Sequence, residues 1–134
     1  MLAIALAVGG QEDPGFKVIV HADNPTTSVE RSKLSKMFLK KSKRWDDGES
    51  VKPIDQDEKS EVRERFTRTV HKKSISAIKS YWQRMIFSGR DVPPQEVATD
   101  AEVIEFVAAE RGAVGYVSSG AELGSGVKVL EVAE

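Results

Sequence analysis

The chain contains no cysteine and has almost no excess charge of either sign. Without cysteine it has no disulfide framework, no thiolate metal site and no cysteine nucleophile. The formal net charge is −1, so the composition carries no global electrostatic signature. A length of 134 residues is typical of one domain with a modest core of its own.

Catalytic and metal-binding motifs are also missing. The two histidines, His21 and His71, are far apart, and neither has the spacing of a metal ligand. We interpret His71, near the end of a predicted helix, as a surface residue that compensates the helix dipole. The paired aspartates lie in predicted turns and lack the pattern of a calcium-binding loop. The sequence therefore predicts no enzyme, no metal and no cofactor.

Charge is unevenly distributed along the chain. Residues 11–90 contain 18 Lys and Arg against 12 Asp and Glu, whereas residues 91–134 contain 2 against 9. This favours two different faces or neighbours, with ordinary solvated surface as the alternative. Residues 31–44 hold seven basic side chains and no acidic one. A helix there must also bury Leu34 and Phe38, so we interpret its lysines as a solvated face and predict no nucleic-acid binding.

The first ten residues, MLAIALAVGG, are apolar and too short to span a bilayer. They are typical of the apolar part and cleavage zone of a secretory signal peptide, although the usual basic start is missing. We therefore predict a truncated signal peptide over residues 1–11 and a domain over residues 12–134, in a periplasmic or secreted protein. The alternative is that the apolar residues form a buried first strand.

Hydrophobic periodicity predicts four strands and four helices. The order is strand, helix, strand, three helices and two strands, which argues for a three-layer α/β unit with a small mixed sheet. A capping box at Thr99 to Glu102 marks the start of the last helix. The strands are expected over residues 16–22, 51–54, 114–117 and 127–132, and the helices over residues 30–40, 60–71, 74–87 and 99–110.

The stretch from Val51 to Phe66 is the best candidate for a small-molecule site. A strand ends in a polar turn, and a helix then begins at Ser60. The free N–H groups of the first helical turn, at Glu61, Val62 and Arg63, together with the helix dipole, favour a bound anion. The side chains of Lys59 and Arg63 would add positive charge. The alternative is a plain N-cap serine with Arg63 solvated.

Three segments follow one another along the chain: VIVHADNP, LSKMFLKKSKRWDDGESVKPIDQDEKSEVRERF and GAVGYVS. In their order and spacing, from about Phe16 to Val132, they resemble the phosphate-binding proteins of ABC transporters, which are type 2 periplasmic binding proteins. The resemblance implies a single lobe of a fold that normally has two lobes with the ligand between them. Phe16–Ala22 and Val127–Val132 would be the segments that cross between lobes.

The resemblance also places the phosphate loop of the family, D-G-S-G-T-R, on Glu58 to Arg63. Ser60 and Arg63 match, but Lys59 and Glu61 replace both glycines and Val62 replaces the threonine. Glycine lets the backbone approach an oxyanion closely, so the loss of both glycines predicts weak binding. We therefore expect an exported module that binds phosphate or a similar oxyanion weakly, with a membrane transporter or another protein as partner. The alternative is a non-catalytic interaction domain, with self-association among its expected properties.

Overall fold

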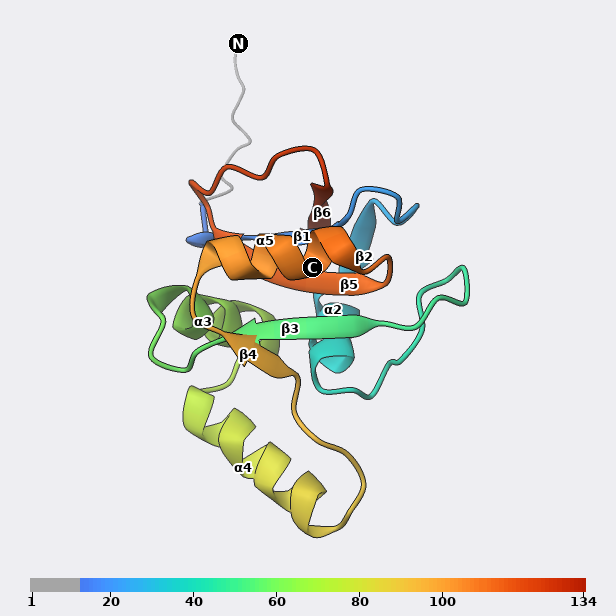
Figure 1. Ribbon diagram of the computed structural model, residues 1–134. Coiled ribbons are helices and arrows are strands. Elements are labelled where there is room, and N and C mark those ends of the chain that lie inside the picture. The colour runs from blue at the N-terminus through green and yellow to red at the C-terminus, as the bar shows by residue number, and fades with distance from the viewer. Residues whose placement is uncertain (1–12) are drawn as a thin grey trace.

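The computed structural model describes residues 13–134, which form one mixed β-sheet with helices packed on both faces (Figure 1). The predicted signal peptide, residues 1–11, lies outside the described residues. In chain order the elements are β1 (Phe16–His21), β2 (Ser28–Glu30), α2 (Arg31–Phe38), β3 (Lys52–Gln56), α3 (Glu61–Phe66), the π-helical turn η1 (Thr67–His71), α4 (Ile75–Phe87), β4 (Gln95–Val97), α5 (Asp100–Ala109), β5 (Ala113–Ser118) and β6 (Val127–Ala133).

The strand order is β2-β6-β1-β5-β3-β4. Strand β1 is antiparallel to both β5 and β6, whereas β3 is parallel to both β5 and β4. Strands β5, β3 and β4 therefore run in one direction, and their C-terminal ends lie along the same edge of the sheet. This edge is where ligands bind in many α/β proteins.

The predicted α/β fold with a mixed sheet is confirmed, and the sheet is larger than expected. Strands β2 and β4 are missing from the sequence-based prediction. Each has only three residues, which is too short to display an alternating pattern. Both lie at the edges of the sheet, where pairing with β6 and β3 defines them.

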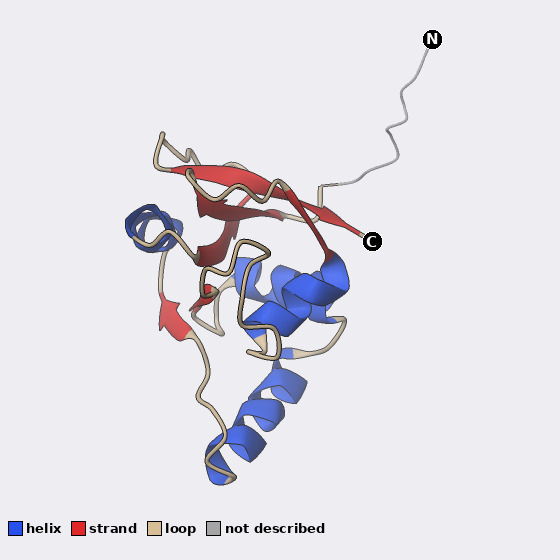
Figure 2. Ribbon diagram, turned by 90° about the vertical axis from the view of Figure 1, so that its right-hand side faces the viewer, coloured by secondary structure: helices blue, strands red, loops and turns tan. Residues whose placement is uncertain are grey.

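Two apolar layers enclose the sheet. Helices α2 and α3 and the turn η1 pack on one face, around Phe38, Phe66 and Tyr116. Helix α5 packs on the other face through Val103 and Val107. The alternation of side chains along β1 serves both layers, because consecutive residues of a strand point to opposite faces. Figure 2 shows α5 separated by the sheet from the other helices, so the predicted three layers are present.

The helix predicted over residues 60–71 differs from the one observed. Helix α3 ends at Phe66, and the chain continues as η1 to His71 before Lys72 takes a left-handed conformation with φ of 56°. The prediction that His71 is an exposed, dipole-compensating residue is wrong. His71 is buried, with its ring edge-on to Phe66 at a centroid distance of 5.7 Å.

The burial of His71 changes its protonation. Its Nδ1 lies 2.7 Å from Ser35 Oγ, in a hydrogen bond that ties η1 to α2. Burial lowers the pKa of His71 to about 4, and the positive charges of Arg63, Lys73 and Arg31 act in the same direction. The neutral imidazole is therefore the form that the folded protein accommodates.

This environment predicts that the protein loses stability in mild acid. Because the folded pKa of His71 is below its unfolded value of 6.5, its contribution is complete above pH 6.5 and is lost as the pH falls toward about 4. The loss should be about 3 kcal/mol of unfolding free energy over that range. Urea unfolding of the wild type and of His71→Gln, each at neutral and at acidic pH, measures this difference.

The matched control is His21→Gln, which changes the other histidine. His21 Nδ1 accepts a hydrogen bond from the backbone N–H of Asp23 within a local turn. This variant should keep the pH dependence of the wild type, whereas His71→Gln should flatten it. Equal pH dependence in the wild type and His71→Gln would contradict the assignment.

Candidate ligand-binding site

Ser60 forms the N-cap of α3, as predicted. Its Oγ accepts a hydrogen bond from the backbone N–H of Arg63 at 3.3 Å and donates one to Gln56 Oε1, also at 3.3 Å. The preceding turn is closed by Asp57, whose backbone carbonyl accepts from the N–H of Ser60 at 2.9 Å. The serine hydroxyl therefore joins the end of β3 to the first turn of the helix.

A second helix begins at the same edge of the sheet. Thr99 is the N-cap of α5, and its Oγ1 accepts a hydrogen bond from the backbone N–H of Glu102 at 3.2 Å. The Thr99 hydroxyl also donates to the Glu102 carboxylate at 3.1 Å. The predicted helix start at Thr99 is therefore confirmed, but Glu102 binds the Thr99 hydroxyl and not the backbone N–H that a capping box uses. Because α3 follows β3 and α5 follows β4, and these strands are parallel neighbours, the two helices start side by side.

The two helix starts border a hollow of about 310 Å³. Of the residues predicted to contact a ligand, Ser60, Glu61 and Val62 line it, whereas Lys59 and Arg63 do not. The sequence pattern did not identify Ser118 on β5 or Asp100 on α5 as ligand contacts. The lining residues are Gln56, Ser60, Glu61, Val62, Arg65, Ala98, Thr99, Asp100 and Ser118.

The Arg63 side chain lies beneath the turn instead of in the hollow. It is only 4% exposed, and its Nη1 donates to the backbone carbonyl of Gln56 at 2.7 Å. Its Nε lies 3.3 Å from a carboxylate oxygen of Asp55, and Nη1 lies 3.2 Å from Glu96. The guanidinium therefore holds the ends of β3 and β4 against α3. At the turn itself Arg63 contributes only its backbone N–H, which donates to Ser60 Oγ.

Asp55 and Tyr116 complete this buried polar cluster. The Tyr116 hydroxyl donates to the Asp55 carboxylate and accepts from the backbone N–H of Gln56 at 3.1 Å. Burial raises the pKa of Asp55, while the charge of Arg63 opposes the shift. Burial and the neighbouring carboxylate raise the pKa of Tyr116, so its hydroxyl stays protonated as a donor. The Tyr116 ring stacks on Phe66 at 3.9 Å between centroids.

Carboxylates occupy part of the hollow. One oxygen of Asp100 accepts hydrogen bonds from Gln56 Nε2 at 2.9 Å and from the backbone N–H of Ser118 at 3.2 Å. Glu61 forms an ion pair with Arg65 at 3.0 Å. Arg65 thus compensates Glu61, whereas Asp100 has no ion-pair partner within residues 13–134 and opposes the field that favours an anion there.

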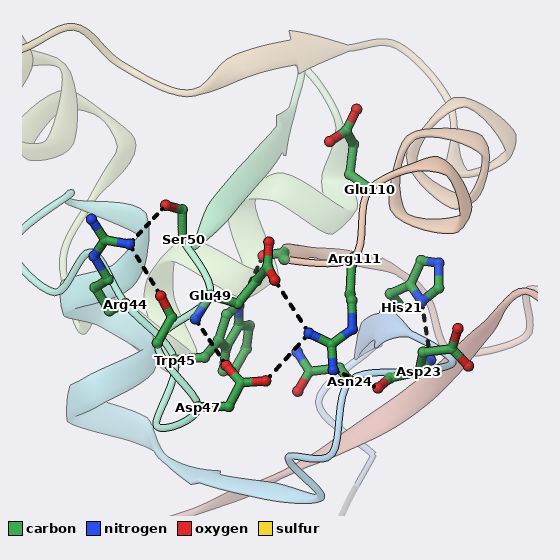
Figure 3. A network of polar contacts seen from close by, with 12 residues as sticks. His21, Asp23, Asn24, Arg44, Trp45, Asp47, Glu49, Ser50, Glu110 and Arg111 are labelled. Carbon is green, nitrogen blue, oxygen red and sulfur yellow. Dashed lines mark hydrogen bonds and ion pairs between the residues drawn. The ribbon is translucent and has the colours of Figure 1, made fainter.

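A second polar cluster lies at the N-terminal ends of β3 and β5, at the other edge of the sheet from the hollow. There the loop before β3 meets the turn between α5 and β5 (Figure 3). Arg111 lies 3.4 Å from Asp47 and 3.2 Å from Glu49, and the buried Trp45 Nε1 donates to the Gly112 carbonyl at 2.9 Å. Because ion pairs with Arg111 neutralise both carboxylates, this cluster holds the loop before β3 against the turn between α5 and β5. Across residues 13–134 no three acidic, histidine or cysteine side chains are grouped as metal ligands.

Comparison with known proteins places this geometry in a larger context. Neither a protein-family model nor a curated protein sequence matches the chain. Solved structures do match. An ABC-type phosphate transport receptor from Vibrio cholerae superposes with a TM-score of 0.68 at 18% identity. The chain has the fold of part of a phosphate-transport receptor.

Further solved structures agree with this fold. A Clostridium perfringens protein described as a phosphate ABC transporter substrate-binding protein, with phosphate bound, matches with a TM-score of 0.67 at 17% identity. PstS from Borrelia burgdorferi matches with a TM-score of 0.61 at 17% identity. Each alignment covers 88% of this chain, but only 46%, 44% and 47% of the Vibrio, Clostridium and Borrelia chains. The chain therefore spans less than half the length of these proteins.

The buried cluster predicts a large effect of removing its cation. Arg63→Met leaves the Asp55 carboxylate buried without its counter-charge, which should lower the unfolding free energy by about 3–5 kcal/mol. Urea unfolding followed by far-UV circular dichroism measures the loss. The double variant Asp55→Asn with Arg63→Met should recover a substantial part of it, because the uncompensated charge is gone.

Arg65→Met is the matched control for this experiment. Arg65 lies two residues further along the same helix, but its ion pair with Glu61 is exposed to solvent. Exposed pairs of this kind contribute little to stability. A loss in Arg65→Met as large as that in Arg63→Met would argue against a special role for the buried pair.

Proposed function

We propose that this chain is an exported, non-enzymatic binding module that holds phosphate or another small oxyanion weakly at the turn around Ser60. The proposed contacts are the Ser60 hydroxyl and the backbone N–H groups of Glu61 and Val62, while the N–H of Arg63 donates to Ser60 Oγ and orders the cap. Lys59, on the exposed turn, would supply positive charge. The side chain of Arg63 would act indirectly by fixing the shape of the turn.

One observation carries the proposal. The starts of α3 and α5 border a single hollow at the C-terminal edge of three parallel strands, β5, β3 and β4. Both helix dipoles thus place partial positive charge beside the same space, and the hydroxyls of Ser60 and Thr99 stand there as further partners. The fold shared with phosphate-transport receptors, one of them described with phosphate bound, supports an oxyanion as the ligand.

The proposed affinity is weak for three physical reasons. The Asp100 carboxylate lines the hollow and repels an anion, and the charge of Arg65, the cation that also lines it, is engaged by Glu61. Lys59 and Glu61 flank Ser60, where glycines would let the backbone approach an oxyanion more closely. Strong sites also bury most of their ligand, and this hollow stands at the edge of the sheet.

We further propose a periplasmic or secreted location and a membrane transporter or another protein as partner. The apolar start of the sequence supports export. Within residues 13–134, no helix combines the length and the apolar character needed to cross a bilayer. The alternative function is a non-catalytic protein-interaction domain that no longer binds an anion.

Titration calorimetry with phosphate and with sulfate tests the proposal. We expect binding in the millimolar range, which Ser60→Ala should abolish because the variant removes both a hydroxyl and the cap that orders the turn. The control is Ser74→Ala, which removes the N-cap serine of α4 instead. Ser74→Ala should bind phosphate like the wild type.

Two outcomes would count against the proposal. Absence of heat with both anions at millimolar concentration favours the interaction-domain alternative. Binding that Ser74→Ala abolishes and Ser60→Ala leaves intact would place the anion at the start of α4, beside Lys72 and Lys73, and not at the proposed turn.

A further inference from the structure

Helix α4 projects from the rest of the molecule. In Figures 1 and 2 it extends away from the sheet and from the other helices. It is attached through a small apolar cluster in which Ile78 and Trp82 pack against Leu39. The Tyr81 hydroxyl donates to the Leu39 carbonyl at 2.9 Å and strengthens this attachment. The C-terminal end of α4, which we call its far end, is therefore exposed to solvent.

The far end of α4 carries exposed apolar side chains. Phe87, the last residue of the helix, is 93% exposed, Ile86 is 53% exposed, and Val92 in the following loop is 59% exposed. We call these three residues the α4 tip. They are three of the four large apolar side chains that the described residues expose, so apolar exposure is concentrated at one end of the molecule.

Two arginines lie beside the α4 tip. Residues 72–90 contain no acidic residue and five Lys and Arg, of which Lys72 and Lys73 precede the other end of the helix and Lys79 pairs with Glu58. Arg84 precedes the tip in sequence and Arg90 lies between Phe87 and Val92, and neither arginine takes part in an ion pair within residues 13–134. In the middle of the helix, Lys41 lies over the Tyr81 ring at 5.3 Å, and beyond its end Lys43 pairs at 3.2 Å with Asp91, the neighbour of Val92.

The acidic groups around α4 are neutralised. Glu58 pairs with Lys79 at 2.9 Å, Asp91 pairs with Lys43, and Glu96 pairs with Arg63. The acidic excess of residues 91–134 includes Glu102 and Glu105 on α5, which lies at the opposite end of the molecule from α4 in Figure 1. The charge is thus polarised, with free basic groups at the α4 end.

We propose that the α4 tip docks on the surface of an anionic phospholipid bilayer. Exposed apolar and aromatic side chains with flanking arginines match the boundary between acyl chains and charged headgroups. A projecting helix end reaches a flat surface without obstruction from the sheet. Three side chains offer far less area than the roughly 800 Å² per partner of a standard protein interface, so a lipid surface fits better than a protein.

Sedimentation with lipid vesicles tests this proposal. The full chain should bind vesicles that contain phosphatidylglycerol and bind pure phosphatidylcholine vesicles much less, and high salt should weaken the binding. Phe87→Gln should lower the partition coefficient by about tenfold. Arg84→Gln and Arg90→Gln should each lower it by about fivefold. The apolar start of the sequence is the same in every variant, so the differences report on the tip.

The matched controls are Val129→Thr and Lys128→Gln, an exposed apolar residue and a basic residue on β6. Both should bind vesicles like the wild type. Equal binding to both kinds of vesicle, or wild-type binding by Phe87→Gln, would overturn the proposal. So would tighter binding to a single-stranded oligonucleotide than to anionic vesicles, or an effect of Phe87→Gln on self-association with none on vesicle binding.

Discussion

A buried ion pair between Asp55 and Arg63 organises one whole edge of the sheet. Burying two charges costs several kcal/mol unless each finds a partner of good geometry, so the pair tolerates little rearrangement around it. Arg63 also binds the Gln56 carbonyl, and Tyr116 donates to Asp55 while its ring stacks on Phe66. The end of β3, the first turns of α3 and the end of β5 are thereby fixed to one another.

This constraint explains why the turn at Ser60 has a defined shape without glycine. The arginine beneath the turn supplies hydrogen bonds that hold the last residue of β3, and Ser60 caps the helix that follows. Parallel pairing of β3 with β4 then brings the start of α5 to the same place. The resulting hollow combines two helix starts with two carboxylates, Glu61 and Asp100, and this mixture is the physical basis for the weak affinity proposed here.

The sequence was sufficient to predict the elements whose residues interact locally or repeat regularly. The strands around Val18 and Val114 and the caps at Ser60 and Thr99 all follow from patterns within a few residues. The α/β class follows from their order. Strands β2 and β4 could not be predicted, because three-residue segments such as Ser28–Glu30 are defined by pairing with a distant strand.

The protonation and partners of charged residues were harder to predict for the same reason. His71 has the local context of a helix end, but it is buried against Phe66 and Ser35, which come from α3 and α2. Arg63 has the local context of a phosphate ligand, but its side chain turns inward to Asp55 and Glu96. In both cases a residue remote in the chain determines where the side chain lies.

The most direct measurement is a phosphate titration followed by amide chemical shifts in two-dimensional nitrogen–proton NMR spectra. The account predicts that the largest shifts occur at the backbone N–H groups of Ser60 to Arg63, with smaller shifts at the start of α5 near Asp100. Ser74→Ala, at the start of α4, should leave that pattern in place. Shifts confined to the basic residues around Lys72 and Lys73, or no shifts at millimolar phosphate, would contradict it.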